Sequence, residues 1–480
     1  MHIVHIGSEF SPIAKVGGLG DVIYGLSKQL HSLGESVLVV LPKYSSLNTK
    51  PLKGLHLNRK KTITLFNKTS FEVSYWSAFY DQVPLLLIEA EAPFDVFKRS
   101  GIYGEKDDVF RFLLFSYLAI EYLTLTINAR CVVHLHDWQA AFVAIFYHEL
   151  FRSEAKAPFS FLLTIHNLMH QGREDQKILS YFNLKMKQDF EDPQHPSQIN
   201  LLKSGMIYAN KITTVSPTYA KEILTPAFSY YLDATLWKCK NKIQGILNGI
   251  DLDYWNPYSQ EDLWHPFFPN STAEQLLETK KTNKRALQEK LHLKPSKAPL
   301  FCVISRLDTQ KSPQLIYEAS QYLIQKECQM IILGKTHDFG TKQLMQELES
   351  NLHPSLNFYF REDFDECLAK MLYAGCDFIL IPSSFEPCGL TQMIAMRYGT
   401  VPVARKTGGL ADTVIENPKE SQTGFIFEGL NRTEMNQAIE RAIGFYYEPL
   451  SRTALINKLF QIDHSWKAPA FAYLDLYKEL

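Results

Sequence analysis

The chain has 480 residues, of which 46% are hydrophobic and 21% charged, values typical of an ordinary globular protein that is too long for a single core. Lys and Arg together number 50 and Asp and Glu 51, which leaves a formal net charge of -1. No overall positive field therefore attracts nucleic acid or an acidic membrane, and an anionic ligand must be met by local cations.

The seven cysteines form no C-x-x-C pair and are odd in number, which indicates neither a zinc site nor a complete disulfide framework and favours a reducing cytoplasm. The N-terminus lacks a basic region and carries Glu9 too early for a signal peptide. The most apolar stretch, residues 110–127, is interrupted by Arg111 and Glu121, which favours a buried helix over a membrane span. We expect a cytoplasmic protein with no membrane partner.

In the first half of the chain, short apolar runs alternate with helical patterns. Runs without polar alternation are typical of parallel strands buried on both faces. They lie at residues 3–6, 37–41, 85–88, 131–135, 161–165, 212–215 and 243–247. Helices are predicted between them at residues 20–33 and 138–150.

Residues 254–270, rich in Trp, Pro and Asp, interrupt this alternation and precede a charged helix around residues 274–291. A second set of predicted strands follows at residues 300–304, 330–333, 358–360, 378–381, 401–403 and 425–427. The helices predicted with it lie at residues 313–326, 364–374, 389–398 and 433–446. Two rounds of alternation predict an α/β protein, with domains at residues 1–248 and 249–459.

Polar side chains follow many of the predicted strands. In open parallel sheets, ligands bind at the carboxyl ends of the strands. The residues found there are His136-Asp137, His166-Asn167, Asn248-Gly249, Ser305-Arg306 with nearby Lys311, the segment around Glu386, and Arg405 to Gly409. A single strand-end histidine is more often structural than catalytic, but six such strand ends in one chain favour a ligand site.

Two glycine-bearing turns open predicted helices, at residues 15–21 (KVGGLGD) and 384–390 (SFEPCGL). A helix start exposes unpaired N–H groups, and glycine lets the backbone approach an oxyanion closely. Taken alone, either turn is more often a tight connection. Arg306 and Lys311 could jointly neutralise a diphosphate, and the alternative for them is a solvated surface pair.

Seven motifs then make the chain resemble bacterial glycogen synthases and plant starch synthases. They are KVGGLGDV (residues 15–22), HLHDW (134–138), TIHN (164–167), VSPTYA (215–220), NGID (248–251), SRL with QK (305–311) and FEPCGLTQ (385–392). They occur in order across nearly the whole chain, which makes the resemblance far more specific than one glycine-rich turn.

The resemblance implies two Rossmann-like domains facing each other across a deep cleft, with a C-terminal helix, within residues 460–480, that crosses back to the first domain. It implies a retaining transfer of glucose from ADP-glucose or UDP-glucose to the non-reducing end of glycogen or another α-1,4-glucan. No metal and no cofactor are expected. The oligomeric state is not predicted.

The resemblance also implies site residues. Those expected to bind the donor and its phosphates are Lys15, Gly17, Gly18, Asn248, Phe364, Cys388, Gly389, Leu390 and Thr391. Those expected to be catalytic are Asp137, His166, Arg306, Lys311 and Glu386, with Asp21 and Asn167 near the sugars. His166 is implied to bond the 6-hydroxyl of the transferred glucose, and Glu386 to contact the sugar.

The chain departs from its relatives at two positions outside these motifs. Ser312 stands where a glycine usually follows Gln-Lys. Phe364 falls where relatives have a tyrosine that stacks on the donor base, so the preferred base stays open.

Two alternatives remain. A nicotinamide oxidoreductase is disfavoured, because G-x-G-x-x-G is absent and the second strand ends in Pro42-Lys43 rather than an acid. A non-catalytic glucan-binding protein is disfavoured because binding glucan alone would not need a diphosphate clamp.

Overall fold

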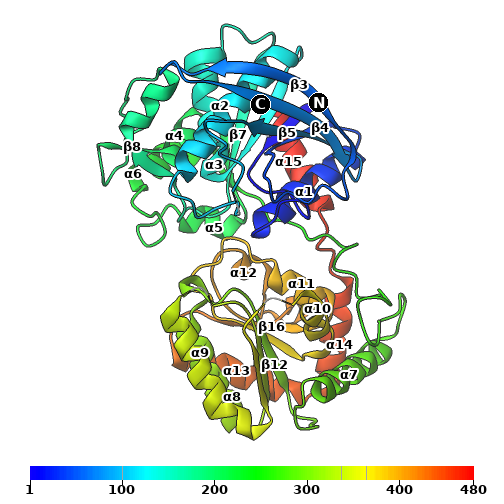
Figure 1. Ribbon diagram of the computed structural model, residues 1–480. Helices are drawn as coiled ribbons and strands as arrows, with labels where there is room; N and C mark the ends of the chain where they lie inside the picture. The colour runs from blue at the N-terminus through cyan, green and yellow to red at the C-terminus, as the bar shows by residue number, and fades with distance from the viewer. Residues whose placement is uncertain (100, 337, 364) are drawn as a thin grey trace. The chain divides into compact units, whose positions relative to one another are not determined.

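The structure is a computed structural model of the chain and describes residues 1–99, 101–336, 338–363 and 365–480 (Figure 1). The chain divides into two compact units, one of Met1–Gly249 with Trp466–Leu480 and one of Ile250–Ser465. The boundary that we predict after Asn248 differs from this division by one residue. Residues 460–465, which we predict to lie with the first domain, belong to the second unit.

Unit 1 is built on a nine-stranded sheet in the order β11-β10-β7-β6-β1-β2-β5-β4-β3. The strands from β11 to β5 pair in parallel, and β4 and β3 pair antiparallel at one edge. Their bounds are β1 (His2–Ile6), β2 (Ser36–Pro42), β3 (Lys53–Thr64), β4 (Ser70–Tyr80), β5 (Val83–Ala90), β6 (Cys131–His136), β7 (Phe159–Ile165), β10 (Lys211–Thr214) and β11 (Ile243–Gly245). A separate pair joins β8 (Arg173–Asp175) to β9 (Gln198–Asn200).

The helices of unit 1 include those predicted at residues 20–33 and 138–150, the expected buried helix at 110–127, the expected C-terminal helix and several more. They are α1 (Gly18–Ser32), α2 (Asp108–Thr126), α3 (Asp137–Phe146), α4 (Leu201–Tyr208), α5 (Pro217–Glu222), α6 (Asp233–Cys239) and α15 (Lys467–Lys478). The predicted helix at residues 138–150 is α-helical only to Phe146 and continues as a π-helical turn, Tyr147–Phe151.

The helix α2 is the apolar stretch noted in the sequence. Among the described residues it alone is long and apolar enough to cross a membrane, but 67% of its apolar window is buried inside the structure. Its Arg111 is fully buried and bonds to Asp108 and to the Val96 carbonyl. These are the properties of a core helix, as predicted.

The C-terminal helix α15 completes the core of unit 1, beside α1 (Figure 1). Trp466, Tyr473 and Tyr477 are at most 4% exposed in a cluster with Ile3 and Leu26. The helix therefore packs on the first domain, as the resemblance implies.

Unit 2 carries a six-stranded, all-parallel sheet in the order β14-β13-β12-β15-β16-β17. Its strands are β12 (Leu300–Ile304), β13 (Gln329–Leu333), β14 (Phe358–Arg361), β15 (Phe378–Ile381), β16 (Val401–Arg405) and β17 (Phe425–Phe427). Its helices are α7 (Ala273–Lys290), α8 (Pro313–Gln325), α9 (Phe339–Leu352), α10 (Glu366–Gly375), α11 (Thr391–Arg397), α12 (Gly408–Thr413), α13 (Arg432–Tyr446) and α14 (Pro449–Gln461). The predicted α/β class is confirmed in both units.

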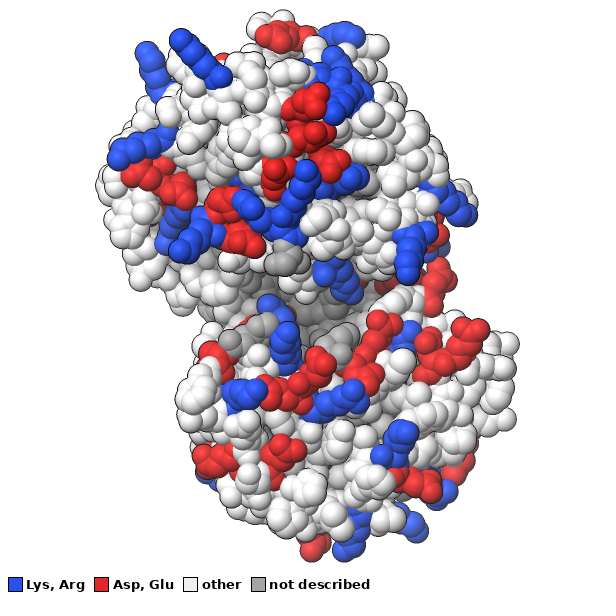
Figure 2. Space-filling model, in the orientation of Figure 1, with Lys and Arg blue, Asp and Glu red and all other residues white. Residues whose placement is uncertain are grey.

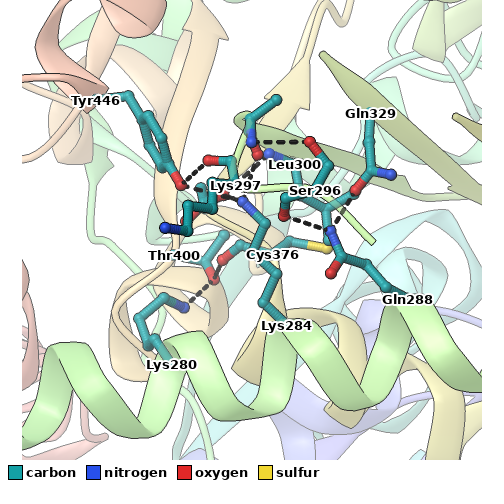
Figure 3. A network of polar contacts seen from close by, with 12 residues as sticks. Lys280, Lys284, Gln288, Ser296, Lys297, Leu300, Gln329, Cys376, Thr400 and Tyr446 are labelled. Atoms are coloured by element: carbon teal, nitrogen blue, oxygen red, sulfur yellow. Dashed lines mark hydrogen bonds and ion pairs between the residues drawn. The ribbon is translucent and has the colours of Figure 1, made fainter. Parts of the chain in front are cut away.

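The charged helix α7 buries a polar face (Figure 3). Lys280, Lys284 and Gln288 are spaced by four residues, so they share one side of the helix, and each is at most 5% exposed. Lys280 Nζ donates to Thr400 Oγ1 at 2.8 Å and to three carbonyls, and Lys284 Nζ pairs with Asp377 at 2.6 Å. Hydrogen bonds therefore attach this helix to the rest of unit 2.

The surface is mixed in charge. On the face drawn in Figure 2, Lys and Arg are interspersed with Asp and Glu, as the near-zero net charge predicts. All seven cysteines are free thiols, six of them buried.

Candidate active site

Each sheet has a point where the strand order reverses, and the predicted site residues follow the strands beside it. In unit 1 the point lies between β1 and β6, and in unit 2 between β12 and β15. Residues 15–18 follow β1 and Asp137 follows β6, whereas Lys311 follows β12 and Glu386 follows β15. Ligands of open α/β sheets bind at such points, so the topology supports both groups as site candidates.

The turn after β1 is organised by Glu9, which the sequence analysis missed as a site residue. Its Oε2 accepts hydrogen bonds from the backbone of Val16 at 2.7 Å and Gly17 at 2.8 Å, and Tyr103 donates to its Oε1 at 2.8 Å. The Gly17 N–H that we predict to bind phosphate therefore bonds to a carboxylate in this structure. The available signal was an acid that follows a predicted buried strand and precedes two glycines.

The other residues of this turn lie at the start of α1. Gly17 is the N-cap in extended backbone, with no side-chain cap, and Gly18 is the first helical residue. Lys15 Nζ pairs with Asp21 Oδ1 at 2.8 Å, and both side chains are about a third exposed, at 36% and 33%. Both predicted ligand-binding side chains therefore reach solvent.

Asp137 begins α3 in the left-handed region, with φ at 57°. Its Oδ1 accepts the backbone N–H of His166 at 2.7 Å and of Asn167 at 3.5 Å. Burial raises the pKa of Asp137 to about 7, against the effect of these two bonds. The carboxylate thus positions the turn after β7, so the structure brings three predicted residues together.

His166 is half-buried and joins a group of histidines. Its Nε2 lies 3.0 Å from Nδ1 of His136, whose Nε2 lies 3.1 Å from Nδ1 of His5. Burial lowers the pKa of His166 to about 3, so the ring is neutral at physiological pH.

One group among the described residues brings together metal-ligand types, the buried His5, His134 and His136. Both ring nitrogens of His134 already bond, to Tyr477 at 2.7 Å and Thr164 at 2.6 Å. Every ring nitrogen of this cluster except His5 Nε2 forms a hydrogen bond within the described part of the chain, and our expectation of no metal stays a prediction.

In unit 2, Lys311 and Glu386 form an ion pair although they are 75 residues apart. Their side chains are only 16% and 10% exposed, and Ser383 Oγ donates to Glu386 Oε2 at 2.8 Å. The sequence predicts the cation for the phosphates and the acid for the sugar, but it did not predict their contact. Ser383 was also missed, because nothing in its motif distinguishes it from Ser384.

Arg306, the predicted companion of Lys311, lies apart from this pair. Its side chain is 57% exposed, and its ion pair with Asp308 is long, at 3.7 Å. The guanidinium is therefore open to solvent, and its predicted role against a diphosphate stays a prediction.

The segment after β15 is held against the one after β16. Arg405 NH1 donates to the Ser384 carbonyl at 2.5 Å, and the Gly409 N–H donates to the Glu386 carbonyl at 3.0 Å. A Cβ at Gly408 would lie 1.9 Å from the Glu386 carbonyl oxygen. The glycines after β16 therefore permit a close backbone approach that positions Glu386.

The predicted phosphate-binding residues open α11. Gly389 has a φ of 71°, a backbone conformation that favours glycine. Leu390 and Thr391 are half-buried at the start of the helix. Cys388 is buried, and its carbonyl accepts from Gln392 Nε2 at 3.2 Å. The predicted residue Phe364 lies outside the described residues.

Three buried polar atoms near these strand ends have no hydrogen-bond partner among the described residues. They are Asn248 Oδ1, Ser305 Oγ and Gln392 Oε1. Buried polar atoms are normally paired, so these three atoms are exceptions in the structure. Asn248 is the one of them that we predict from the sequence.

Comparison with known proteins identifies the family of the chain. Residues 2–238 match the family described as Starch synthase catalytic domain, and residues 284–446 match Glycosyl transferases group 1. A glycogen synthase of Protochlamydia amoebophila (strain UWE25) is 35% identical over 100% of this chain and 99% of its own length. The chain belongs to the glycogen and starch synthase family. It is therefore a glycosyltransferase, and the oxidoreductase alternative is wrong.

A solved structure of the family agrees in fold. The catalytic domain of Starch Synthase IV from Arabidopsis thaliana, bound to ADP and acarbose, is 36% identical, with a TM-score of 0.92 over 100% of this chain and 99% of that one. Sucrose-phosphate synthase from Thermosynechococcus elongatus, at 18% identity and a TM-score of 0.62, shares the fold. The two Rossmann-like domains predicted for a glycogen and starch synthase are thus confirmed.

Proposed function

We propose that this glycosyltransferase is a glycogen synthase that transfers glucose from ADP-glucose to the non-reducing end of an α-1,4-glucan, with retention of configuration. The observation that carries the proposal is the Lys311–Glu386 ion pair after β12 and β15. It joins a cation suited to the diphosphate of the donor and an acid suited to its sugar, at a topological switch point. The ADP and acarbose in the starch synthase IV relative support an adenine nucleotide and a glucan as substrates.

In the proposed reaction, the bond between C1 of glucose and the diphosphate oxygen breaks, and a bond from C1 to the 4-hydroxyl oxygen of the acceptor forms on the same face. The departing phosphate takes the acceptor proton, so ADP and a longer glucan result. Lys311 and Arg306 offset the charge that grows on the diphosphate as the bond breaks. Asp137 fixes the backbone that carries His166, which bonds the 6-hydroxyl of the transferred glucose.

UDP-glucose is a second donor in this proposal. Phe364 keeps a stacking ring but lacks the hydroxyl of the tyrosine in relatives, a loss of roughly 0.5–1.5 kcal/mol of base contact. That loss relaxes selectivity without excluding adenine. The cytoplasm is the proposed compartment, supported by the seven free thiols.

The test is an initial-rate comparison of ADP-glucose and UDP-glucose with glycogen as acceptor. We expect turnover with both and a higher kcat/KM for ADP-glucose. Phe364→Tyr should shift the ratio further toward ADP-glucose, and an unmoved ratio would show that residue 364 does not contact the base. Glycogen binding without transfer from either donor would favour the non-catalytic alternative instead.

A further inference from the structure

Three strands place one histidine each in a single hydrogen-bonded line beneath the candidate active site. His5 lies within β1, His136 ends β6 and His166 follows β7, and these strands are neighbours in the sheet. The line runs from His5 Nδ1 to His136 Nε2 at 3.1 Å, and from His136 Nδ1 to His166 Nε2 at 3.0 Å. We call these three residues the histidine relay. One nitrogen is left over at each end, His5 Nε2 and His166 Nδ1.

The relay is uncharged. Burial lowers the pKa of His5 and of His166 to about 3, and that of His136 well below its usual value. A neutral imidazole carries one N–H, so the donors in the relay must all point the same way. Only two arrangements satisfy both hydrogen bonds: all three rings protonated on Nδ1, or all three protonated on Nε2.

The buried end of the relay distinguishes these arrangements. His5 Nε2 is buried and makes no hydrogen bond to any residue that the structure describes. If all three rings were protonated on Nε2, the buried N–H of His5 Nε2 would have no acceptor among the described residues. If all three are protonated on Nδ1, His5 Nε2 has only a lone pair without a donor. Orphaned buried N–H groups are rarer in proteins than under-satisfied acceptors.

We propose that the histidine relay holds His166 in the Nδ1–H tautomer, so that His166 donates a hydrogen bond to the 6-hydroxyl oxygen of the transferred glucose. His136 and His5 are then positioning residues that act through His166. This inference rests on the proposed function for the identity of the acceptor, but the tautomer itself follows from the relay. His134 lies on the same strand as His136 yet bonds to Tyr477 and Thr164 instead.

The experiment combines ¹⁵N NMR of histidine side chains in the full-length protein with steady-state kinetics. His166→Asn assigns the His166 signals, and we expect the wild type to show them as Nδ1–H. His136→Leu should abolish that preference and lower kcat about tenfold, the value of one neutral hydrogen bond in the transition state, with the donor KM nearly unchanged. His136→Asn, whose amide can still donate to His166 Nε2, should keep the tautomer and most of the turnover.

His134→Leu is the matched control, because His134 packs against the rings of His5 and His136 but forms its hydrogen bonds with Tyr477 and Thr164, outside the relay. It should leave the His166 signals unchanged and reduce kcat far less than His136→Leu. An Nε2–H tautomer in the wild type would overturn the proposal, as would equal effects of the two leucine variants on kcat. Since the tautomer is measured without turnover, failure of glucose transfer alone would count against the proposed function and not against the relay.

Discussion

Lys311 and Glu386 are in contact, yet we expect them to act on different quantities: Glu386 on turnover and Lys311 on the affinity for ADP. Glu386→Gln removes the negative charge and should lower kcat at least a hundredfold if the acid meets the sugar. The ADP dissociation constant should change less than about threefold, because the Lys311 charge that meets the phosphates remains. Lys311→Met should weaken ADP binding about tenfold or more, since it also leaves the nearly buried carboxylate unpaired.

Calorimetric ADP titration and initial rates measure both effects. Lys326→Met, at the exposed end of α8, controls for the loss of one positive charge. Loss of ADP affinity in Glu386→Gln as large as that in Lys311→Met would contradict the division of roles.

Ser312, which stands where relatives have a glycine, has a backbone conformation that favours glycine. It caps α8 in the left-handed region, with φ at 54°, and its side chain makes no cap hydrogen bond. A left-handed L-residue costs about 1–2 kcal/mol, and glycine loses about 0.5–1 kcal/mol more entropy on folding. Ser312→Gly should therefore raise the free energy of unfolding by about 0.5 kcal/mol, measured by urea denaturation. Ser312→Ala, which keeps the Cβ, should show no gain.

At the scale of elements, the polar face of α7 makes stability depend on pH. Burial lowers the pKa of Lys280 to about 8 from the usual 10.5. Between these values the unfolded chain binds more protons than the folded one, so the contribution of Lys280 to the free energy of unfolding rises with pH across this window. The total rise is of the order of 3 kcal/mol. Below pH 8 the lysine is charged in both states, and its contribution is constant.

Lys280→Met should lack this rise. Urea denaturation of the wild type and the variant from pH 7 to 10 measures the difference, which should grow in favour of the wild type as the pH increases. Lys281→Met changes the exposed neighbour, which pairs with Glu278, and it should follow the wild-type profile. Parallel profiles of the wild type and Lys280→Met would contradict the lowered pKa of Lys280.

Most of the strands predicted correctly have residues that are buried on both faces of a sheet. The apolar run of β12, for example, is buried at all five residues, so its pattern determines its place in the sheet. The hairpin of β3 and β4 was missed because β3 lies at the sheet edge and exposes most of its residues, which leaves little hydrophobic signal. The buried lysines of α7 were missed as core residues because their partners, which include carbonyls, Thr400 and Asp377, lie far away in the sequence.

At the scale of the whole molecule, a glycine lets the end of the chain dock on its beginning. A Cβ at Gly25 in α1 would lie 2.0 Å from Trp466 Nε1 and 2.4 Å from its Cδ1. Overpacking of this kind costs about 1–3 kcal/mol, so Gly25→Ala should lower the free energy of unfolding by that amount. Hydrogen exchange in α15 should increase with it.

Gly444→Ala, in α13, is the control, because its Cβ would meet no atom within 4 Å. Alanine should stabilise that helix by about 0.5–1 kcal/mol. Equal exchange rates in α15 for Gly25→Ala and the wild type would show that the docked end does not depend on this contact.

The sequence indicates candidate site residues one at a time but not their arrangement. Asp137, His166, Lys311 and Glu386 all stand at strand ends, where parallel sheets bind ligands. The ion pair between Lys311 and Glu386 and the line from His5 to His166 depend on the strand order, which brings distant residues side by side. The interior position of His5 in β1 gave no functional signal in the sequence.

Because α15 belongs to unit 1, the core of unit 1 is completed only after unit 2 has been synthesised. Unit 1 includes Trp466–Leu480, so its core is incomplete until these residues are translated, whereas the whole of unit 2 has by then been synthesised. At about 5–20 residues per second, the N-terminal segment waits roughly ten seconds or longer for its final helix. During that time the apolar face that receives Trp466 and Tyr473 is uncovered, so the nascent chain exposes apolar surface that the finished protein buries.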